Sequence, residues 1–138
     1  MQLEYTIEEK TPTAVQWMSL RRSVGWATFP LEAARRSLEL TPFCVSAFAG
    51  DQLVGMGRVL GDCVITFYVG NVMVTPEYQG TGVGGQIMER IMAYLHKNAV
   101  PGAIASLLSI QGVEDFYEQY GFERRPDEKH GSGMSLRF

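Results

Sequence analysis

The hydrophobic and polar residues in the first third of the chain are spaced as in one strand followed by two helices. Leu3, Tyr5 and Ile7 alternate with polar neighbours, which predicts a first strand. A helix is expected over residues 11–23, with a proline near its first turn, and a second helix over residues 30–40. The second helix has apolar residues on one face, namely Leu31, Ala34 and Leu38.

The middle of the chain has the pattern of three consecutive strands. Phe43–Ala49 and Leu53–Leu60 are β-rich and flank a turn at Gly50-Asp51-Gln52, which predicts two paired strands. Val64–Val74 is a longer β-rich run, interrupted by Gly70-Asn71. A glycine inside a strand often marks a bulge or a close approach of another backbone.

The last part of the chain alternates between helices and strands. Apolar residues follow the 3.6-residue period over Gly82–Asn98 and predict a helix; they are Val83, Ile87, Ile91, Tyr94 and Leu95. Ile104–Ile110 predicts a strand and Val113–Tyr120 a short helix. Phe122–Arg125 and Met134–Phe138 are expected to form two final strands.

This order of elements, β-α-α-β-β-β-α-β-α-β-β, predicts an α/β (α+β) fold. Antiparallel neighbours come first and one βαβ crossover follows, so we expect a central mixed, mostly antiparallel sheet flanked by about four helices. The 138 residues contain no linker, repeat or low-complexity tract, which indicates a single domain over residues 1–138.

Composition and charge exclude several classes of partner. The net charge is −3, which argues against a nucleic-acid partner, and no apolar run approaches the length of a membrane span. The first residues lack the pattern of a secretory signal, so we expect a cytoplasmic protein. Cys44 and Cys63 show neither metal-ligand nor disulfide spacing and are expected to be reduced, buried thiols, and no metal site is predicted.

The glycine-rich stretch Val72–Gly85 carries the strongest chemical signal. It is predicted as a strand, a proline turn, a loop and the start of a helix, where main-chain N–H groups without intrahelical partners form an anion site. The amides expected to donate are those of Gln79, Gly80, Gly82 and Gly84. No lysine or arginine lies in the loop, so recognition of a pyrophosphate would rest on amides.

Two other phosphate-binding interpretations of this loop fit less well. Gly80–Gly85 matches G-x-G-x-x-G, but the following strand, Ile104–Ile110, lacks the acidic residue that dinucleotide binding requires. The Lys-Ser/Thr pair of a P-loop is also missing. An alternative stays open, in which the glycines only allow the chain to turn and the loop binds no phosphate.

Two motifs resemble those of the GCN5-related N-acetyltransferases (GNAT). Gln79–Gly84 is similar to motif A of this family, Q/R-x-x-G-x-G/A, and Asp115–Phe122 is similar to its F-Y-x-x-x-G-F signature. One helix and one strand separate the motifs, as in the family. Residues 120–134 are similar to compact members that include arylalkylamine acetyltransferases.

The resemblance implies a splay between the central strands Val64–Val74 and Ile104–Ile110, into which acetyl-CoA binds and from which coenzyme A leaves. The implied cofactor-binding residues are Val72, Met73, Val74, Gln79, Gly80, Thr81, Gly82, Val83, Gly84, Gly85 and Tyr117. Many relatives have asparagine seven residues before the signature tyrosine, where this chain has Ile110. Dimers are common in the family, which leaves a homodimer open.

The resemblance also implies a reaction, the direct attack of a primary amine on the acetyl thioester. Tyr117 matches the tyrosine that protonates the leaving thiolate as a general acid, although it could equally be an aromatic packing residue. A backbone amide at or near Val74 would polarise the thioester carbonyl. No general base is assigned. The candidates are a water held by Tyr68 or Asn71, the carboxylates of Glu114 or Asp115, and desolvation of the amine.

The acceptor pocket is expected near the first two helices and the central strands. Trp26, Phe29 and Tyr68 are the predicted substrate-binding residues, for a small-molecule amine, with core packing as the alternative. Arg21 and Arg22 are expected to be solvated helix positions rather than carboxylate ligands. Two further functions stay open, a protein or peptide N-acetyltransferase and a non-catalytic acetyl-CoA-binding sensor.

Overall fold

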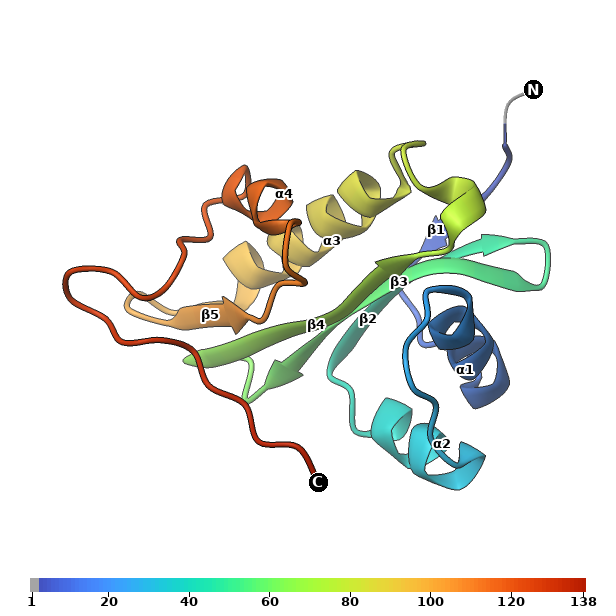
Figure 1. Ribbon diagram of the computed structural model, residues 1–138, viewed down its shortest axis with the longest axis horizontal. Helices are drawn as coiled ribbons and strands as arrows, with labels where there is room; N and C mark the ends of the chain where they lie inside the picture. The colour runs from blue at the N-terminus through green and yellow to red at the C-terminus, as the bar shows by residue number, and fades with distance from the viewer. Residues whose placement is uncertain (1–2) are drawn as a thin grey trace. The chain divides into compact units, whose positions relative to one another are not determined.

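A computed structural model describes residues 3–138 of the chain (Figure 1). The elements are β1 (Thr6–Glu8), α1 (Ala14–Ser23), α2 (Leu31–Glu39), β2 (Phe43–Ala49), β3 (Gln52–Gly61), β4 (Thr66–Val74), η1 (Pro76–Tyr78), α3 (Val83–Asn98), β5 (Ile104–Leu107) and α4 (Glu114–Glu118). The chain divides into two compact units, Met1–Ala105 and Ser106–Phe138. The expectation of a single domain stays a prediction.

The strands form one mixed sheet in the order β1-β2-β3-β4-β5. The first four strands pair antiparallel with their neighbours. β4 and β5 are joined through α3, and a connection of this kind is a crossover between parallel strands. The predicted α/β (α+β) fold with a mixed, mostly antiparallel sheet is confirmed.

One face of the sheet is covered by α3, which lies directly on the main chain of β3. A Cβ atom added to Gly55 would lie 2.9 Å from Val83 Cγ1, and one added to Gly57 would lie 2.8 Å from Ile91 Cδ1. The predicted apolar face of α3 is confirmed, since Val83, Ile87 and Ile91 are all fully buried. Two glycines in β3 therefore bring the helix closer than any side chains would allow.

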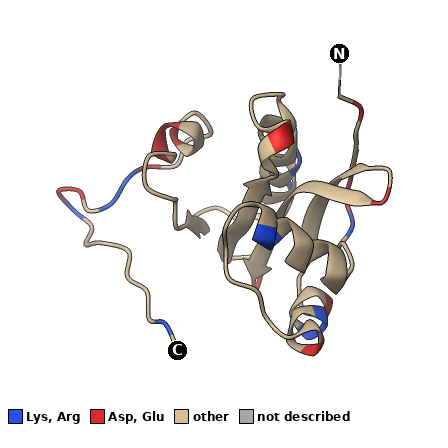
Figure 2. Cartoon of the chain, turned by 45° about the vertical axis from the view of Figure 1, so that its right-hand side comes forward, with Lys and Arg blue, Asp and Glu red and all other residues tan. Residues whose placement is uncertain are grey.

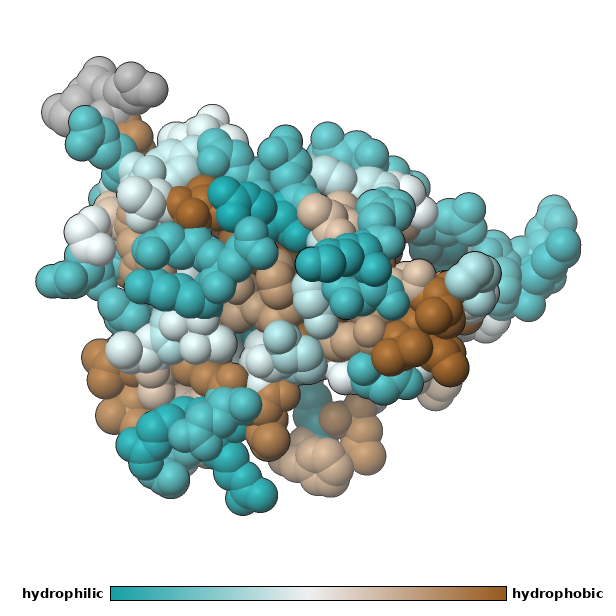
Figure 3. Space-filling model, turned by 180° about the vertical axis from the view of Figure 1, so that it is seen from behind, coloured by the Kyte–Doolittle hydropathy of each residue, from teal (hydrophilic) through white to brown (hydrophobic). Residues whose placement is uncertain are grey.

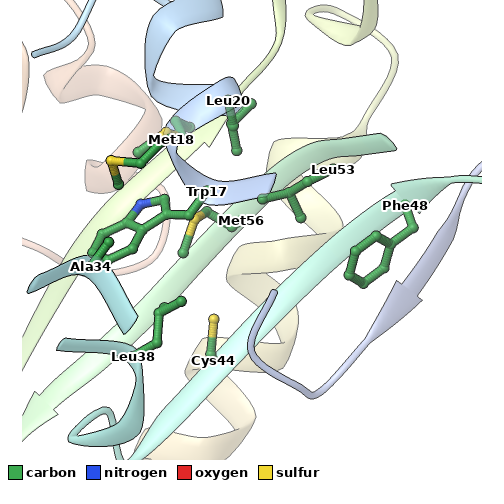
Figure 4. Close-up of a cluster of buried hydrophobic side chains, with 10 residues drawn as sticks. Trp17, Met18, Leu20, Ala34, Leu38, Cys44, Phe48, Leu53 and Met56 are labelled. Atoms are coloured by element: carbon green, nitrogen blue, oxygen red, sulfur yellow. The ribbon is translucent and has the colours of Figure 1, made fainter. Parts of the chain in front are cut away.

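The opposite face of the sheet is covered by α1 and α2 (Figure 1). A cluster of buried side chains fills the space between these helices and the strands (Figure 4): Trp17, Met18, Leu20, Ala34, Leu38, Cys44, Phe48, Leu53, Met56 and Met73. The predicted inward face of α2 holds for Ala34 and Leu38, whereas Leu31, at the first turn, is half exposed. Exposed hydrophobic side chains lie in separate patches among hydrophilic ones (Figure 3).

A bulge interrupts β4 where the sequence predicted it. Met56 pairs with Met73 and Arg58 pairs with Gly70, so two residues of β4 lie opposite one residue of β3. Asn71 is in the bulge, with a left-handed φ of 53°. Asparagine tolerates this conformation better than most residues.

The second unit contains α4 and a small aromatic cluster. Phe116 contacts Tyr117 and Tyr120 edge to face, at ring-centroid distances of 5.1 and 5.5 Å, and Tyr117 contacts Phe122 at 6.3 Å. Arg124 binds the carboxylates of Asp115 and Glu118 at 2.6 and 2.8 Å. Both acids lie on α4, so the arginine ties the following segment to the helix.

Three predictions near the C-terminal end were wrong. Neither Phe122–Arg125 nor Met134–Phe138 forms a strand. The strand predicted over Ile104–Ile110 ends at Leu107, because the chain turns there, with Val113 N–H donating to the Ile110 carbonyl. Met134, Leu136 and Phe138 are almost fully exposed, so this alternating segment has no core to face.

Within residues 3–138, no helix has the length and apolar character needed to cross a membrane.

Candidate cofactor and acceptor site

The loop that follows β4 is anchored by main-chain hydrogen bonds and one buried ring. Thr75 N–H donates to the Val54 carbonyl of β3 at 2.8 Å, and Tyr78 N–H donates to the Thr75 carbonyl at 2.9 Å. The Tyr78 ring is buried and contacts Tyr5 edge to face at 6.1 Å. The turn over Pro76–Tyr78 is therefore fixed to the sheet before the glycines begin.

Gly80 and Gly82 adopt the backbone conformation that the sequence predicted for them. Their φ angles are +77° and +95°, which favour glycine, and no other protein atom lies within 4 Å of a Cβ added to either. Gln79 has a different role from the one expected. Its N–H donates to the Pro76 carbonyl at 3.3 Å, and its side-chain Nε2 donates to the Val74 carbonyl at 2.9 Å. Its side chain thus ties the loop to the end of β4.

The first turn of α3 presents main-chain N–H groups without a capping side chain. The N-cap is Gly82, which has no side chain to accept hydrogen bonds from the first N–H groups of the helix. The first turn also has no acidic residue. Gln86 N–H donates back to the Gly82 carbonyl at 3.1 Å, so Val83, Gly84 and Gly85 are the residues whose N–H groups precede the helical ladder. Together with the helix dipole, these groups form an anion site made of backbone alone.

The predicted cofactor residues of β4 lie at its C-terminal end. Met73 is opposite Met56 and Val74 is opposite Gly55, while Val72 lies in the bulge beside Asn71. β5 has four residues against nine in β4, so it is too short to pair with the whole strand. Ile104 N–H donates to the Ile65 carbonyl, just before β4 begins, and Val72–Val74 is the part of β4 farthest from that bond.

Arg21 of α1 lies among three aromatic rings, two of them predicted acceptor residues. Its guanidinium carbon is 5.0 Å from the Phe29 ring, 5.4 Å from the Trp26 ring and 6.0 Å from the Trp17 ring. Its Nε donates to the Ala27 carbonyl at 2.6 Å. Burial lowers the pKa of Arg21. The expectation that Arg21 is a solvated helix position was wrong, because the loop after α1 folds back over the side chain.

Arg58 of β3 is a site residue that the sequence analysis missed. Its Nε donates to Asn71 Oδ1 at 2.6 Å, and its Nη1 donates to Ser37 Oγ at 2.9 Å and Thr41 Oγ1 at 3.1 Å. Its guanidinium carbon lies 4.6 Å from the Trp17 ring. A signal was present, since Arg58 is the only charged residue of a strand that is otherwise almost wholly apolar.

The three predicted acceptor residues differ in exposure. Trp26 is half-buried and packs against the core cluster, so its role combines packing with contact to Arg21. Phe29 is 53% exposed, and Tyr68 is half-buried on β4. The indole Nε1 of Trp17 is buried and has no hydrogen-bond partner in the described part of the chain.

Tyr117, the predicted general acid, lies on α4 in the second unit. Nearby, Glu114 Oε1 accepts a hydrogen bond from Gly112 N–H at 2.6 Å. Main-chain N–H groups, that of Glu114 itself first, lower the pKa of Glu114, and Asp115 is bound to Arg124. Both carboxylates are thus engaged in local bonds, which leaves them poorly placed to act as general bases.

These features define an α/β protein in which a central bulged strand leads through a glycine loop to an uncapped helix start. A family model described as an acetyltransferase (GNAT) domain matches residues 18–136. A probable acetyltransferase of unknown function from meticillin-resistant Staphylococcus aureus has a similar structure, with a TM-score of 0.89 and 31% identity. The match covers 98% of this chain and 100% of that one.

Two curated relatives are longer than this chain. A rice protein (Oryza sativa subsp. japonica) named serotonin N-acetyltransferase 2, chloroplastic, is 34% identical over 113 residues, which are 78% of this chain and 55% of the relative. An uncharacterized N-acetyltransferase ycf52-like protein of Prochlorococcus marinus is 27% identical over 121 residues, 85% of this chain and 66% of the relative. The chain therefore spans between about half and two thirds of their lengths.

The chain belongs to the GNAT acetyltransferase family. Members of this family generally use acetyl-CoA as the acetyl donor.

Proposed function

We propose that this protein is an acetyl-CoA-dependent N-acetyltransferase that acetylates the primary amine of a small molecule by direct attack. The observation that carries the proposal is the uncapped, glycine-lined start of α3 at the end of β4. A diphosphate has the charge that such a helix start accepts, and the loop offers amides instead of cations to bind it.

The residues present fit acetyl-CoA. Gly80, Thr81, Gly82, Val83, Gly84 and Gly85 would hold the diphosphate, with Gln79 positioning the loop through its side chain. The main-chain groups of Val72, Met73 and Val74 would pair with the pantetheine arm. When bound, acetyl-CoA supplies a thioester carbon that is open to attack by an amine.

The chain's own groups have three tasks in this reaction. A main-chain N–H at or near Val74 would stabilise negative charge on the carbonyl oxygen. Tyr117, in the second unit, would supply the proton that the leaving thiolate needs. Tyr68, on β4, and Asn71, in its bulge, remain the candidates for holding a water that takes the proton of the amine, because Glu114 and Asp115 are engaged in local bonds.

Trp26, Phe29 and Tyr68 are proposed to bind the acceptor. The aromatic rings around Arg21 leave Phe29 half exposed, as a wall that a small ligand can contact. Relatives with printed names include a serotonin N-acetyltransferase from rice and a histone acetyltransferase named TAP1 from Glycine max, the latter 30% identical over 115 residues. Their names cover both small-molecule and protein acceptors, so the acceptor class must be measured.

The experiment measures thiol release from acetyl-CoA across a panel of small amines and lysine-containing peptides. Replacing Tyr117 with phenylalanine is expected to lower kcat by about 100-fold or more, the usual contribution of general acid catalysis. The KM for acetyl-CoA should change little. Tyr120→Phe is the matched control, since it removes a hydroxyl from the same aromatic cluster.

Three outcomes would contradict parts of the proposal. Binding of acetyl-CoA without thiol release on any acceptor would favour the sensor function. Turnover of peptides only would move the acceptor class to proteins. An unchanged kcat in Tyr117→Phe would remove that residue from the chemistry.

A further inference from the structure

Two arginines on the α1–α2 face of the sheet lie over the same indole ring. The guanidinium carbons of Arg21 and Arg58 are 6.0 and 4.6 Å from the Trp17 ring. α1 contains two arginines and no acidic residue, whereas α2 contains charges of both signs (Figure 2). Among residues 3–138, the arginines with carboxylate partners are Arg35, Arg90 and Arg124, and neither Arg21 nor Arg58 is among them.

Both arginines are half-buried and lie near each other, so their positive charges are only partly screened by water. Burying a cation without an anionic partner is unfavourable, and two like charges near each other add to the cost. Burial lowers the pKa of Arg58, and the charge of Arg21 lowers it further. The neighbouring Cys44 cannot neutralise the pair near pH 7, because burial raises its pKa to about 11.

The hydrogen bonds of Arg58 hold its guanidinium in one position. Three side chains accept from its Nε and Nη1: Ser37 of α2, Thr41 just after α2, and Asn71 of β4. All three are neutral, and none of the three bonds uses Nη2, which carries two further N–H donors. A fixed guanidinium with a forked donor edge matches the oxygens of a carboxylate or a phosphate.

The indole that both arginines contact also carries a buried donor without a partner in the described residues. Trp17 is 3% exposed, and its indole N–H has no hydrogen-bond partner in the described residues. Figure 4 shows this nitrogen on the ring edge that faces Met18 of α1. Buried donors without partners are rare, and a bound oxyanion or a water that it orders would satisfy this one.

The arginine pair lies next to the proposed point of acetyl transfer. Arg58 is opposite Gly70, which borders the bulge of β4, and bonds to Asn71 in the bulge. Val72, where the proposed pantetheine contacts begin, is the next residue along the chain. An anionic group bound by Arg58 would therefore place an amine a few bonds away close to the bulge.

We propose that the acceptor is a small amine that also carries an oxyanion, a carboxylate or a phosphate, which binds to Arg58 and Arg21. This inference rests on the proposed N-acetyltransferase function and names the substrate class of that site. The aromatic rings of Trp26 and Phe29 screen the ion pair from water on the side of α1.

The kinetic test compares three amines of similar length: propylamine, which has no anion, β-alanine, which carries a carboxylate, and O-phosphoethanolamine. The wild type should prefer one of the two anionic amines, and which one it prefers distinguishes carboxylate from phosphate. In Arg58→Gln, kcat/KM for that amine should fall about 10- to 100-fold, as expected for a lost charge-assisted hydrogen bond. The value for propylamine should fall by a smaller factor, because propylamine has no oxyanion for Arg58 to bind.

Two further variants separate recognition from folding. Arg22→Gln is the matched control, because it removes the neighbouring charge of α1 from an exposed position. Arg21→Gln tests the same site through the arginine that makes fewer hydrogen bonds to the fold. A merely structural role of Arg58 would lower the rates for all three amines together, whereas recognition lowers those for the anionic amines.

A binding test does not depend on catalysis. The protein has two tryptophans, Trp17 and Trp26, and both contact Arg21, so intrinsic fluorescence reports on this site directly. Titration with propionate and with inorganic phosphate should give a saturable change in the wild type and in Arg22→Gln. The change should be lost in Arg58→Gln and Arg21→Gln.

The outcomes distinguish this inference from the function on which it rests. If no amine is acetylated, the proposed function fails and the titrations alone decide on the anion site. If propylamine is acetylated as well as the anionic amines, and neither arginine variant changes their ratio, the enzyme stands and the anionic acceptor is wrong. A fluorescence change that survives in both arginine variants would also overturn the inference.

Discussion

At the residue scale, Gly82 combines a left-handed φ with the N-cap position of α3. Aspartate tolerates left-handed backbone better than most residues, and its carboxylate would accept hydrogen bonds from the first helical N–H groups. Gly82→Asp therefore puts a negative charge where the diphosphate is proposed to bind.

Gly82→Asp is expected to weaken acetyl-CoA binding at least about tenfold, through loss of the N–H donors and through charge repulsion. Its melting temperature without ligand should stay within a few degrees of the wild type. Isothermal titration and thermal unfolding measure the two effects. Gly102→Asp is the control, with a φ of +90° and open space but no helix start, and equal losses in both variants would contradict the site.

The site could be predicted where local backbone chemistry decides it. Gly80 and Gly82 could be recognised because their role depends on φ and on the helix that follows. Arg58 could not, because its partners Ser37 and Thr41, at the end of α2, and Asn71, in β4, are all distant from it in the sequence. Arg21 was misjudged for the same reason, since nothing local shows that a loop will cover it.

At the element scale, α1 begins with a capping box. Thr13 Oγ1 accepts from Gln16 N–H at 3.1 Å, and Gln16 Oε1 accepts from Thr13 N–H at 2.9 Å. The N-cap is thus Thr13, so Pro12 precedes the helix and does not lie in its first turn. Gln16 Nε2 also donates to the Asp51 carbonyl, which connects the helix start to the β2–β3 turn.

Thr13→Ala is expected to lower the free energy of unfolding by about 1 kcal/mol, the usual loss for an N-cap threonine. Urea denaturation measures the change. Thr11→Ala, two residues earlier and exposed, is the control and should have little effect. A Thr13→Ala variant as stable as that control would show that the box contributes nothing measurable.

The β3–β4 turn is organised by one carboxylate. Asp62 Oδ1 accepts from the N–H groups of Val64, Ile65 and Thr66 at 2.9, 2.9 and 3.0 Å. These bonds, that of Thr66 first, lower the pKa of Asp62 below its usual value. The stabilisation is therefore present above the unfolded pKa and lost as pH falls through the folded one.

Asp62→Ala is expected to be less stable than the wild type at pH 7. The difference should shrink as pH falls below about 4, where an unfolded aspartate becomes protonated. Urea denaturation at several pH values measures the difference. Asp51→Ala is the control, since the carbonyl of Asp51, and not its carboxylate, accepts the hydrogen bond from Gln16. A difference independent of pH would contradict a role for the charge.

Most elements could be predicted because each carries its own periodic signal. β2 and α3 were predicted to within about one residue, since alternation and the 3.6-residue period persist over their whole length. The same reasoning failed for Met134–Phe138, which alternates as a strand should. Alternation shows that a segment can be a strand, but a strand also needs a neighbour to pair with, and the pattern does not identify one.

At the scale of the whole molecule, the two cysteines differ in location and in burial. Cys44 is buried in the cluster between the helices and the sheet, with a pKa raised to about 11. Cys63 is half-buried in the β3–β4 turn. The prediction of two buried thiols is thus confirmed for Cys44 and wrong for Cys63.

In a Cys63→Ser variant, the remaining thiol should react with a thiol reagent at least about 100-fold more slowly than the thiol of a Cys44→Ser variant. Burial limits the access of the reagent to Cys44, and the raised pKa of its thiol lowers the fraction present as reactive thiolate. The rates are measured by absorbance under native conditions and compared in denaturant, where they should converge. Similar native rates would show that the core opens readily.

The absence of a side chain at Gly55 also affects the position of the first turn of α3. Val83, which lies against this glycine, is also the first residue of α3, so the backbone of β3 sets how high the helix start rests above the sheet. A homologue with alanine at position 55 would need a smaller residue at position 83, or its first turn of α3 would lie farther from the sheet. We therefore expect these two positions to covary among relatives, as a compensating pair that tunes ligand affinity without touching the ligand.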